Sequence, residues 1–312
     1  TEINLKILQS IFEFLKLKID MMFKTGVEDL IVEDGKVKGI TLENGEQIFA
    51  DDVVLTVGRD GSKWLEKTLS DKGVKSISNQ VDIGVRVETS DVVMKEINEH
   101  LYEGKFIFNT SVGTQVRTFC SNPSGHVVIE NHSGTMLANG HAYKDKALGS
   151  DNTNFALLVS HTFTEPFNQP NEFAHSISRL ANQISNGSIL VQTYGDILKG
   201  RRSTQKRIDE GFIQPTQTTA VPGDLGLVLP YNTMKSLIEM IEALEHVTPG
   251  IASDHTLFYG VEAKFYSSRF DVNNDFQTKI EGLYLGGDGA GFTRGLAQAG
   301  ANGIAIARNI LK

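Results

Sequence analysis

The chain has 312 residues, which suggests either two compact units or one large α/β unit. Its 40% hydrophobic and 22% charged residues are typical of a globular protein, and its net charge of −8 argues against a nucleic-acid-binding surface. A single cysteine, Cys120, excludes a disulfide framework within the chain and favours the cytoplasm, and we identify no membrane span or signal peptide.

The first eighty residues predict a helix, a three-stranded meander and a buried strand. Apolar residues recur at helical spacing from Leu5 to Leu15, so we expect a helix capped by Thr1 that ends near Leu17. The segments VEDLIV, KVKGITL and EQIF are separated by Asp-Gly and Asn-Gly, which favour type I′ turns. The run DDVVLTVG then predicts a strand buried on both faces.

The middle of the chain is predicted to be rich in short strands, with a few helices. The expected elements are a strand over 81–89, a helix over 91–101, several strands within 106–141, and helices over 172–184 and 231–244. A polar segment over 201–211 and a proline-marked loop over 214–224 separate the last two helices.

The last forty residues carry the sharpest pattern. A short strand over 283–285 is followed by the glycine-rich run 286–291, and we expect a helix to start near Ala290. Such a turn gathers backbone N–H groups at the positive end of a helix, and the Asp288 carboxylate can accept hydrogen bonds from hydroxyls. Glycines at 295, 300 and 303 leave the helix surface bare. The pattern predicts a ligand with hydroxyls and partial negative charge.

The segment GLYLGGDGAGFTRGLAQAGANGIAIA resembles the closing FAD motif of flavoproteins that have two dinucleotide-binding domains. The run DDVVLTVGRDG is similar to their second motif, and segments such as IGVRVE and FYGVEAKFYSSRF extend the resemblance to an FAD-dependent dehydrogenase family with its own C-terminal domain. The resemblance implies the following FAD-binding residues: Gly58, Arg59, Gly287, Asp288, Gly289, Ala290, Gly291, Gly295 and Leu296.

The resemblance also implies an architecture. We expect a mixed α/β fold in which residues 1–80 and 271–312 form part of an FAD-binding, Rossmann-like domain and residues 81–270 form an inserted, β-rich substrate or cap domain with helices. The G-x-G-x-x-G of the first strand–turn–helix is absent from the sequence. We therefore expect this chain to be the C-terminal part of a longer protein and to retain no tightly bound FAD by itself.

Three functions remain open at this point. The resemblance favours an oxidoreductase that passes a hydride between FAD and a small organic substrate, with a nicotinamide cofactor as one candidate electron donor and Arg269 as a candidate substrate-binding residue. The first alternative is a non-catalytic flavin- or nucleotide-binding module, such as a sensor or scaffold. The second is a structural α/β protein whose glycines serve packing alone. An oligomer is compatible with all three.

Other candidate residues favour structural roles. His126, His132 and His141 match no zinc-ligand spacing, so we expect no metal site. Cys120 is expected to be a small buried hydrophobe. The basic residues between 201 and 207 predict a solvated face, with a clamp for an anion as the alternative.

Overall fold

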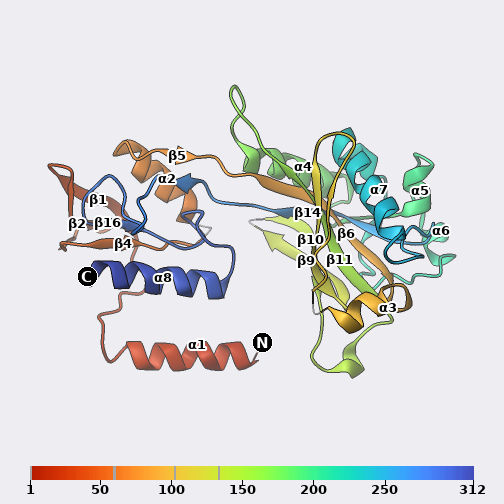
Figure 1. The fold of residues 1–312 in the computed structure, drawn as a ribbon, viewed down its shortest axis with the longest axis horizontal. Helices are drawn as coiled ribbons and strands as arrows, with labels where there is room; N and C mark the ends of the chain where they lie inside the picture. The colour runs from red at the N-terminus through yellow and green to blue at the C-terminus, as the bar shows by residue number, and fades with distance from the viewer. Residues whose placement is uncertain (1, 59–60, 102, 133) are drawn as a thin grey trace. The chain divides into compact units, whose positions relative to one another are not determined.

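The computed structural model describes residues 2–58, 61–101, 103–132 and 134–312. The fold is mixed α/β, as predicted, and the chain divides into two compact units (Figure 1). Unit 1 comprises residues 1–77 and 268–312, and unit 2 comprises residues 78–267. Each of these boundaries lies three residues from the corresponding boundary expected from the sequence. Thr1, the expected helix cap, lies outside the described residues.

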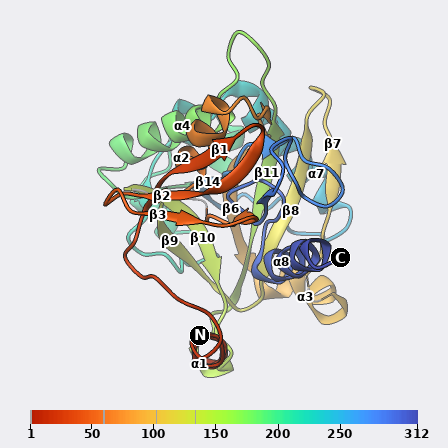
Figure 2. The ribbon, with the colours of Figure 1, turned by 90° about the vertical axis from the view of Figure 1, so that its left-hand side faces the viewer.

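The meander of unit 1 is an antiparallel sheet in the order β1–β2–β3 (Figure 2), with strands at Val27–Glu33, Lys36–Leu42 and Gln47–Phe49. Asp34 and Gly35 have φ values of 50° and 76°, as the first type I′ turn requires. The second turn differs from the prediction, because only Gly45 has a positive φ, at 84°. The Asn44 side chain instead accepts a hydrogen bond from the Glu46 N–H at 3.0 Å, which stabilises a different turn.

A parallel pair of short strands forms the centre of unit 1. Strand β4 (Val53–Leu55) pairs with β16 (Leu283–Leu285), and Leu55, Leu283 and Leu285 are buried in one hydrophobic core. The prediction that β4 is buried on both faces is wrong, because Val54 is 41% exposed. Successive side chains of a strand point to opposite faces, so Val54 lies on the face away from this core.

Helices and a further strand pair complete unit 1. Helix α1 (Glu2–Leu15) ends two residues before the predicted end, and it exposes many of its apolar side chains. Helix α2 (Ser62–Asp71) buries Leu65 and Leu69 in the unit 1 core. Strand β5 (Ser76–Ile77) pairs with β15 (Arg269–Phe270), and the C-terminal helix is α8 (Leu296–Ile310).

Unit 2 is built on a seven-stranded sheet in the order β13–β12–β14–β6–β11–β8–β7. All neighbours are antiparallel except β12 and β13. Its strands are β6 (Val81–Ser90), β7 (Ile107–Asn109), β8 (Gln115–Asn122), β11 (Asn152–His161), β12 (Leu190–Thr193), β13 (Val221–Pro222) and β14 (Leu257–Lys264). A hairpin of β9 (His126–His132) and β10 (Thr135–His141) forms a separate two-stranded sheet.

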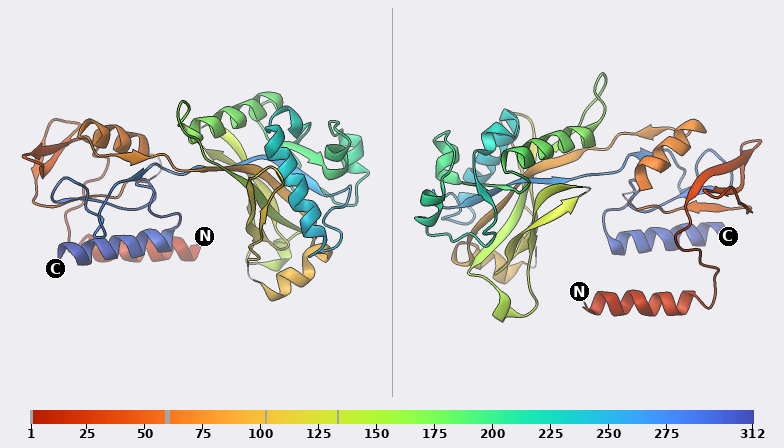
Figure 3. Two further views of the ribbon diagram at one scale, coloured as in Figure 1. Left: turned by 45° about the horizontal axis from the view of Figure 1, so that its top comes forward. Right: turned by 180° about the vertical axis from the view of Figure 1, so that it is seen from behind.

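The two faces of central strand β6 differ in chemistry. Val81, Ile83, Val85 and Val87 belong to the main core of unit 2, together with residues of α7 (Tyr231–Glu245), which packs along the sheet (Figure 3). The alternate positions carry buried polar residues, including Asp82, Arg86 and Glu88. Unit 2 also contains α3 (Asp91–His100), α4 (Pro170–Ile184), α5 (Tyr194–Leu198) and α6 (Gln205–Asp209).

The structure contradicts one residue-level prediction in unit 2 and adds a detail to another. Cys120 is exposed, because its backbone is held in a left-handed conformation (φ 43°) by bonds to the Glu103 carboxylate and the Arg86 guanidinium. The basic segment over 201–207 is exposed at Arg201, Arg202 and Lys206, and Arg201 and Arg207 also donate to the nearly buried carboxylate of Asp196. Of the helices in the described part of the chain, none is long and apolar enough to span a membrane.

Candidate functional site

The glycine-rich segment after β16 lies beside the end of β4. The Gly286 N–H donates to the Leu55 carbonyl at 3.0 Å, and the Gly289 N–H donates to the Val57 carbonyl at 3.1 Å. Two segments about 230 residues apart in the sequence therefore meet at the carboxyl end of a parallel strand pair. In open α/β sheets, this edge is where ligands bind.

The helix after this segment begins later than predicted. Helix α8 starts at Leu296, not near Ala290, with Gly295 as its N-cap residue. Gly287 and Gly291 have φ values of 78° and 73°, and the Gly291 N–H donates to the Asp288 carbonyl, so the segment forms successive turns instead of a helix. The positive end of α8 consequently lies at Gly295 and Leu296.

The predicted cofactor-binding residues fall into two groups. A Cβ atom placed at Gly58, Gly287 or Gly295 would have no heavy atom within 4 Å, so these glycines are open on the side where a side chain would stand, although Gly287 itself is buried. Gly289 and Ala290 serve packing: a Cβ atom at Gly289 would lie 2.3 Å from the Val57 carbonyl oxygen, and Ala290 is fully buried in the unit 1 core. Leu296, at the start of α8, is 89% exposed. Arg59 lies outside the described residues.

Asp288 is held by Thr293, a residue that was not among the predicted site residues. It is partly buried, and the Thr293 hydroxyl donates to its carboxylate. Asn302, on α8, accepts a hydrogen bond from the Gly287 N–H at 2.8 Å and is 8% exposed. The signal for Asn302 was present in the sequence, because it is an amide side chain in a helix otherwise made mostly of alanine, glycine and isoleucine.

Arg269 lies near the same segment. Its guanidinium carbon is 5.7 Å from the centroid of the Phe292 ring, and its side chain is exposed. Asp288, Arg269 and the open glycines therefore belong to one region of unit 1.

The histidines of unit 2 have aromatic neighbours. The His132 ring is stacked on Phe265 with centroids 4.7 Å apart, and His126 and His141 each meet the edge of the Tyr143 ring. Within the described residues, no group of three or more histidine, cysteine or carboxylate side chains is arranged to hold a metal ion.

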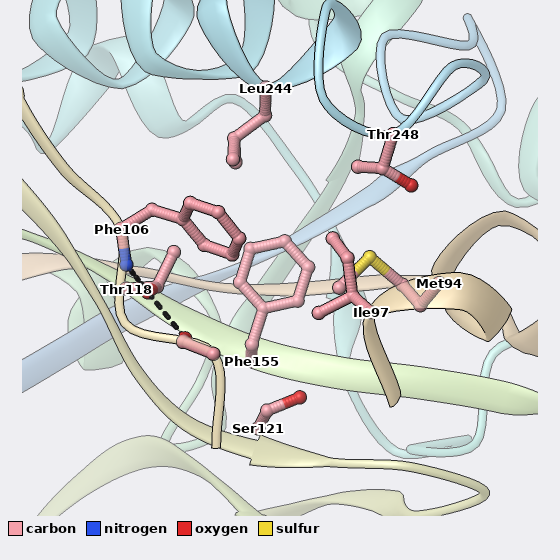
Figure 4. Close-up of a pocket in the computed structure, with 9 residues that line it drawn as sticks. Met94, Ile97, Phe106, Thr118, Ser121, Phe155, Leu244 and Thr248 are labelled. Atoms are coloured by element: carbon pink, nitrogen blue, oxygen red, sulfur yellow. Dashed lines mark hydrogen bonds between the residues drawn. The ribbon is translucent and has the colours of Figure 1, made fainter. Parts of the chain in front are cut away.

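A hollow inside unit 2 is drawn in Figure 4. Its walls are mainly apolar, and the Phe106 N–H donates to the Thr118 hydroxyl at 2.8 Å. The hollow has a volume of about 10 Å³, which suffices for roughly one water molecule. It is therefore too small for an organic substrate. Its labelled lining residues are Met94, Ile97, Phe106, Thr118, Ser121, Phe155, Leu244 and Thr248.

Comparisons with known proteins include one family model that matches more than half of the chain. A family model described as "FAD-dependent protein, C-terminal domain-like" matches residues 80–265. An uncharacterized protein of Clostridium beijerinckii is 27% identical over 96% of this chain and 58% of its own length. The tRNA uridine 5-carboxymethylaminomethyl modification enzyme MnmG of Wolinella succinogenes is 24% identical over 91% of this chain and 43% of its own length.

The solved structures that resemble this chain include PqsL of Pseudomonas aeruginosa, a probable FAD-dependent monooxygenase. It is 14% identical, with a TM-score of 0.34, over 94% of this chain and 53% of PqsL. The chain thus spans about half the length of the relatives it matches.

Proposed function

Because the chain belongs to the family of FAD-dependent proteins with this C-terminal domain, we propose that it is part of an FAD-dependent oxidoreductase. In this proposal, the complete protein passes a hydride between FAD and a small organic substrate, with a nicotinamide cofactor as a candidate electron donor. Unit 1 contributes to the FAD site and unit 2 is the substrate or cap domain.

The observation that carries the proposal is the meeting of the two motif segments. Gly58 and Gly287 follow parallel strands that pair with each other, and both have open backbone beside them. The missing side chains leave room for the flat parts of a dinucleotide cofactor to approach the backbone closely, while the Gly287 N–H itself is bonded to Asn302. The residues present therefore fit an FAD molecule.

We assign each residue a role in holding the cofactor. The Asp288 carboxylate, oriented by Thr293, accepts hydrogen bonds from hydroxyls of the ribityl chain. Gly295 and Leu296 place the positive end of α8 where negative charge is favoured. FAD, when bound, supplies the two-electron chemistry, and the protein supplies position and electrostatics. Arg269 is proposed to bind an acidic group of the substrate, and Arg59 stays a prediction from the resemblance.

The nature of the substrate is a separate part of the proposal. The Wolinella relative is named as a tRNA modification enzyme, whereas the net charge of −8 in this chain favours a small molecule over a nucleic acid. A location in the cytoplasm is proposed from the single cysteine. A non-catalytic flavin module is the alternative, and reduction of bound flavin by NADH or NADPH in the complete protein separates the two.

The FAD site is tested by replacing Asp288 with asparagine in the complete protein. We expect FAD affinity to fall about 10- to 100-fold, because a hydrogen bond to a charged group contributes about 1.5–3 kcal/mol. Asp275→Asn is the matched control, since Asp275 is an exposed carboxylate of the same unit. Equal FAD affinities of the Asp288→Asn variant and the parent, measured by flavin fluorescence after dialysis, would show that the assigned role is wrong.

A further inference from the structure

A polar pocket lies at one end of the seven-stranded sheet of unit 2. Its volume is about 440 Å³, within the range of small-molecule sites. The pocket is formed where β8 begins and β11 ends, next to the residues that precede β6. Its lining includes the polar side chains of six residues: Gln80, Gln115, Arg117, Ser160, His161 and Thr162.

A buried carboxylate under the pocket positions its arginine. Asp82 is fully buried and accepts hydrogen bonds from Arg117 Nη2 at 2.7 Å, the Ser160 hydroxyl at 2.7 Å and the Tyr266 hydroxyl at 2.5 Å. Gln80 Nε2 donates to it as well, at 3.2 Å. With four donors, the hydrogen-bonding capacity of this carboxylate is used within the protein. Asp82 therefore fixes Arg117 and is not a site for a cation.

Arg117 retains unused donors. Its Nη2 atom bonds to Asp82 and Ser160, and its Nε is buried without a partner among the described residues, so Nη1 is the nitrogen left to donate to a ligand. The side chain is 15% exposed, and its guanidinium carbon lies 4.9 Å from the centroid of the Phe119 ring. The ring and Asp82 together hold the guanidinium in one orientation. A guanidinium fixed in this way can donate a charge-assisted hydrogen bond from Nη1 to one oxygen of a carboxylate.

The charges around the pocket favour an anion over a cation. Asp82 balances Arg117, and Lys264 is paired with Glu262, while Lys105 lies over the Phe119 ring at 5.4 Å and adds a positive charge. Burial lowers the pKa of His161, against the opposing effect of the Asp82 charge, so its imidazole is neutral at neutral pH. Because the buried Asp82 carboxylate already offsets the charge of Arg117, a monoanion suits the site better than a dianionic phosphate.

We propose that this pocket binds the carboxylate group of a small organic acid, with Arg117 as its anchor. The ligand carboxylate accepts from the guanidinium, and the rest of the molecule occupies the space between Gln115, His161 and Thr162. Binding itself requires no flavin. Only the further step, that the organic acid is the substrate of the oxidoreductase, rests on the proposed function.

The test uses the 312-residue chain without FAD and sodium benzoate as the probe. Isothermal titration measures affinity, and the ¹⁵N NMR signal of the Arg117 Nε–H reports the place of binding. Benzyl alcohol, which has the same ring without the charge, is the matched ligand control. Arg179→Gln is the matched protein control, because Arg179 is an exposed arginine of α4 paired with Glu172 outside the pocket.

We expect the parent chain to bind benzoate and to bind benzyl alcohol at least about tenfold more weakly. The Arg117→Gln variant should bind benzoate at least about tenfold more weakly than the parent, whereas the Arg179→Gln variant should keep the parent affinity. Since Arg117→Gln also removes a partner of buried Asp82, Thr162→Trp is the second variant: Thr162 is exposed and lines the pocket, it is not one of the four donors to Asp82, and an indole at this position reduces the space for a ligand. Absent benzoate binding, or binding unchanged by Thr162→Trp, would overturn the proposal. Neither result bears on FAD affinity, which the Asp288→Asn experiment measures separately.

Discussion

Asp196 shows how a single carboxylate can organise a basic segment. Ser203, Arg207 and Arg201 donate to its two oxygens at 2.7, 2.9 and 2.6 Å. Burial opposes its ionisation, but these hydrogen bonds outweigh burial and lower the pKa of Asp196 below its ordinary value of 3.8. The arginines that the sequence placed on a solvated face are thus part of the local structure of unit 2.

This lowered pKa predicts a pH dependence of stability. The stabilisation is complete above pH 4 and is lost as the pH falls through the folded-state pKa. We expect Asp196→Asn to reduce the free energy of unfolding by about 1–3 kcal/mol at pH 7, with the difference from the parent shrinking below about pH 4. Urea unfolding between pH 3 and 7 measures it, with exposed Asp20→Asn as the control. A difference that stays constant over this range would contradict the assignment.

At the scale of elements, α8 is fastened to the glycine-rich segment by Asn302. Replacing Asn302 with alanine leaves the Gly287 N–H without its acceptor, at a cost of about 1–3 kcal/mol. We expect faster amide hydrogen exchange at Gly287 and its neighbours, measured by NMR or mass spectrometry. Asn309→Ala, seven residues further along the same helix, is the control and should leave exchange in this segment unchanged. If amide exchange around Gly287 is equally fast in the Asn302→Ala and Asn309→Ala variants, Asn302 does not hold α8 to the glycine-rich segment.

The elements also show what local sequence could and could not predict. The meander was predictable because Asp34-Gly35 strongly favours a tight hairpin turn and the segments on either side are rich in valine, isoleucine and leucine. The start of α8 was not, because the sequence from Ala290 is compatible with both turns and helix, and tertiary bonds to Val57 and Asn302 decide between them. The pocket at Arg117 follows no motif, since it depends on the order of strands β6, β11 and β8 in the sheet.

At the scale of the whole molecule, α1 has an unusual amount of exposed apolar surface. Leu5, Leu8 and Phe14 are 67%, 61% and 59% exposed. Since large exposed apolar patches promote association, we expect the 312-residue chain to self-associate as its concentration rises. Leu8→Glu with Phe14→Glu should shift it towards the monomer in size-exclusion chromatography with light scattering. Phe212→Glu, which charges an 86% exposed phenylalanine of unit 2, should not.

The absence of a G-x-G-x-x-G sequence leads to a second prediction for the whole chain. The strand–turn–helix that carries this motif binds the pyrophosphate of FAD, so residues 1–312 should retain no stoichiometric flavin after purification. The visible absorption spectrum and a titration with FAD measure this directly. A yellow protein with one flavin per chain would contradict the prediction and would mean that the segment after β16 suffices for binding.

Cys120 gives this chain a practical property. It is the single thiol of the sequence, its side chain is exposed, and it follows Arg117 by three residues on β8. Its N–H and carbonyl are each bonded, to Glu103 at 2.9 Å and to Arg86 at 2.7 Å, so the backbone that carries the thiol is anchored. A maleimide fluorophore will therefore attach at one defined position without any engineered cysteine.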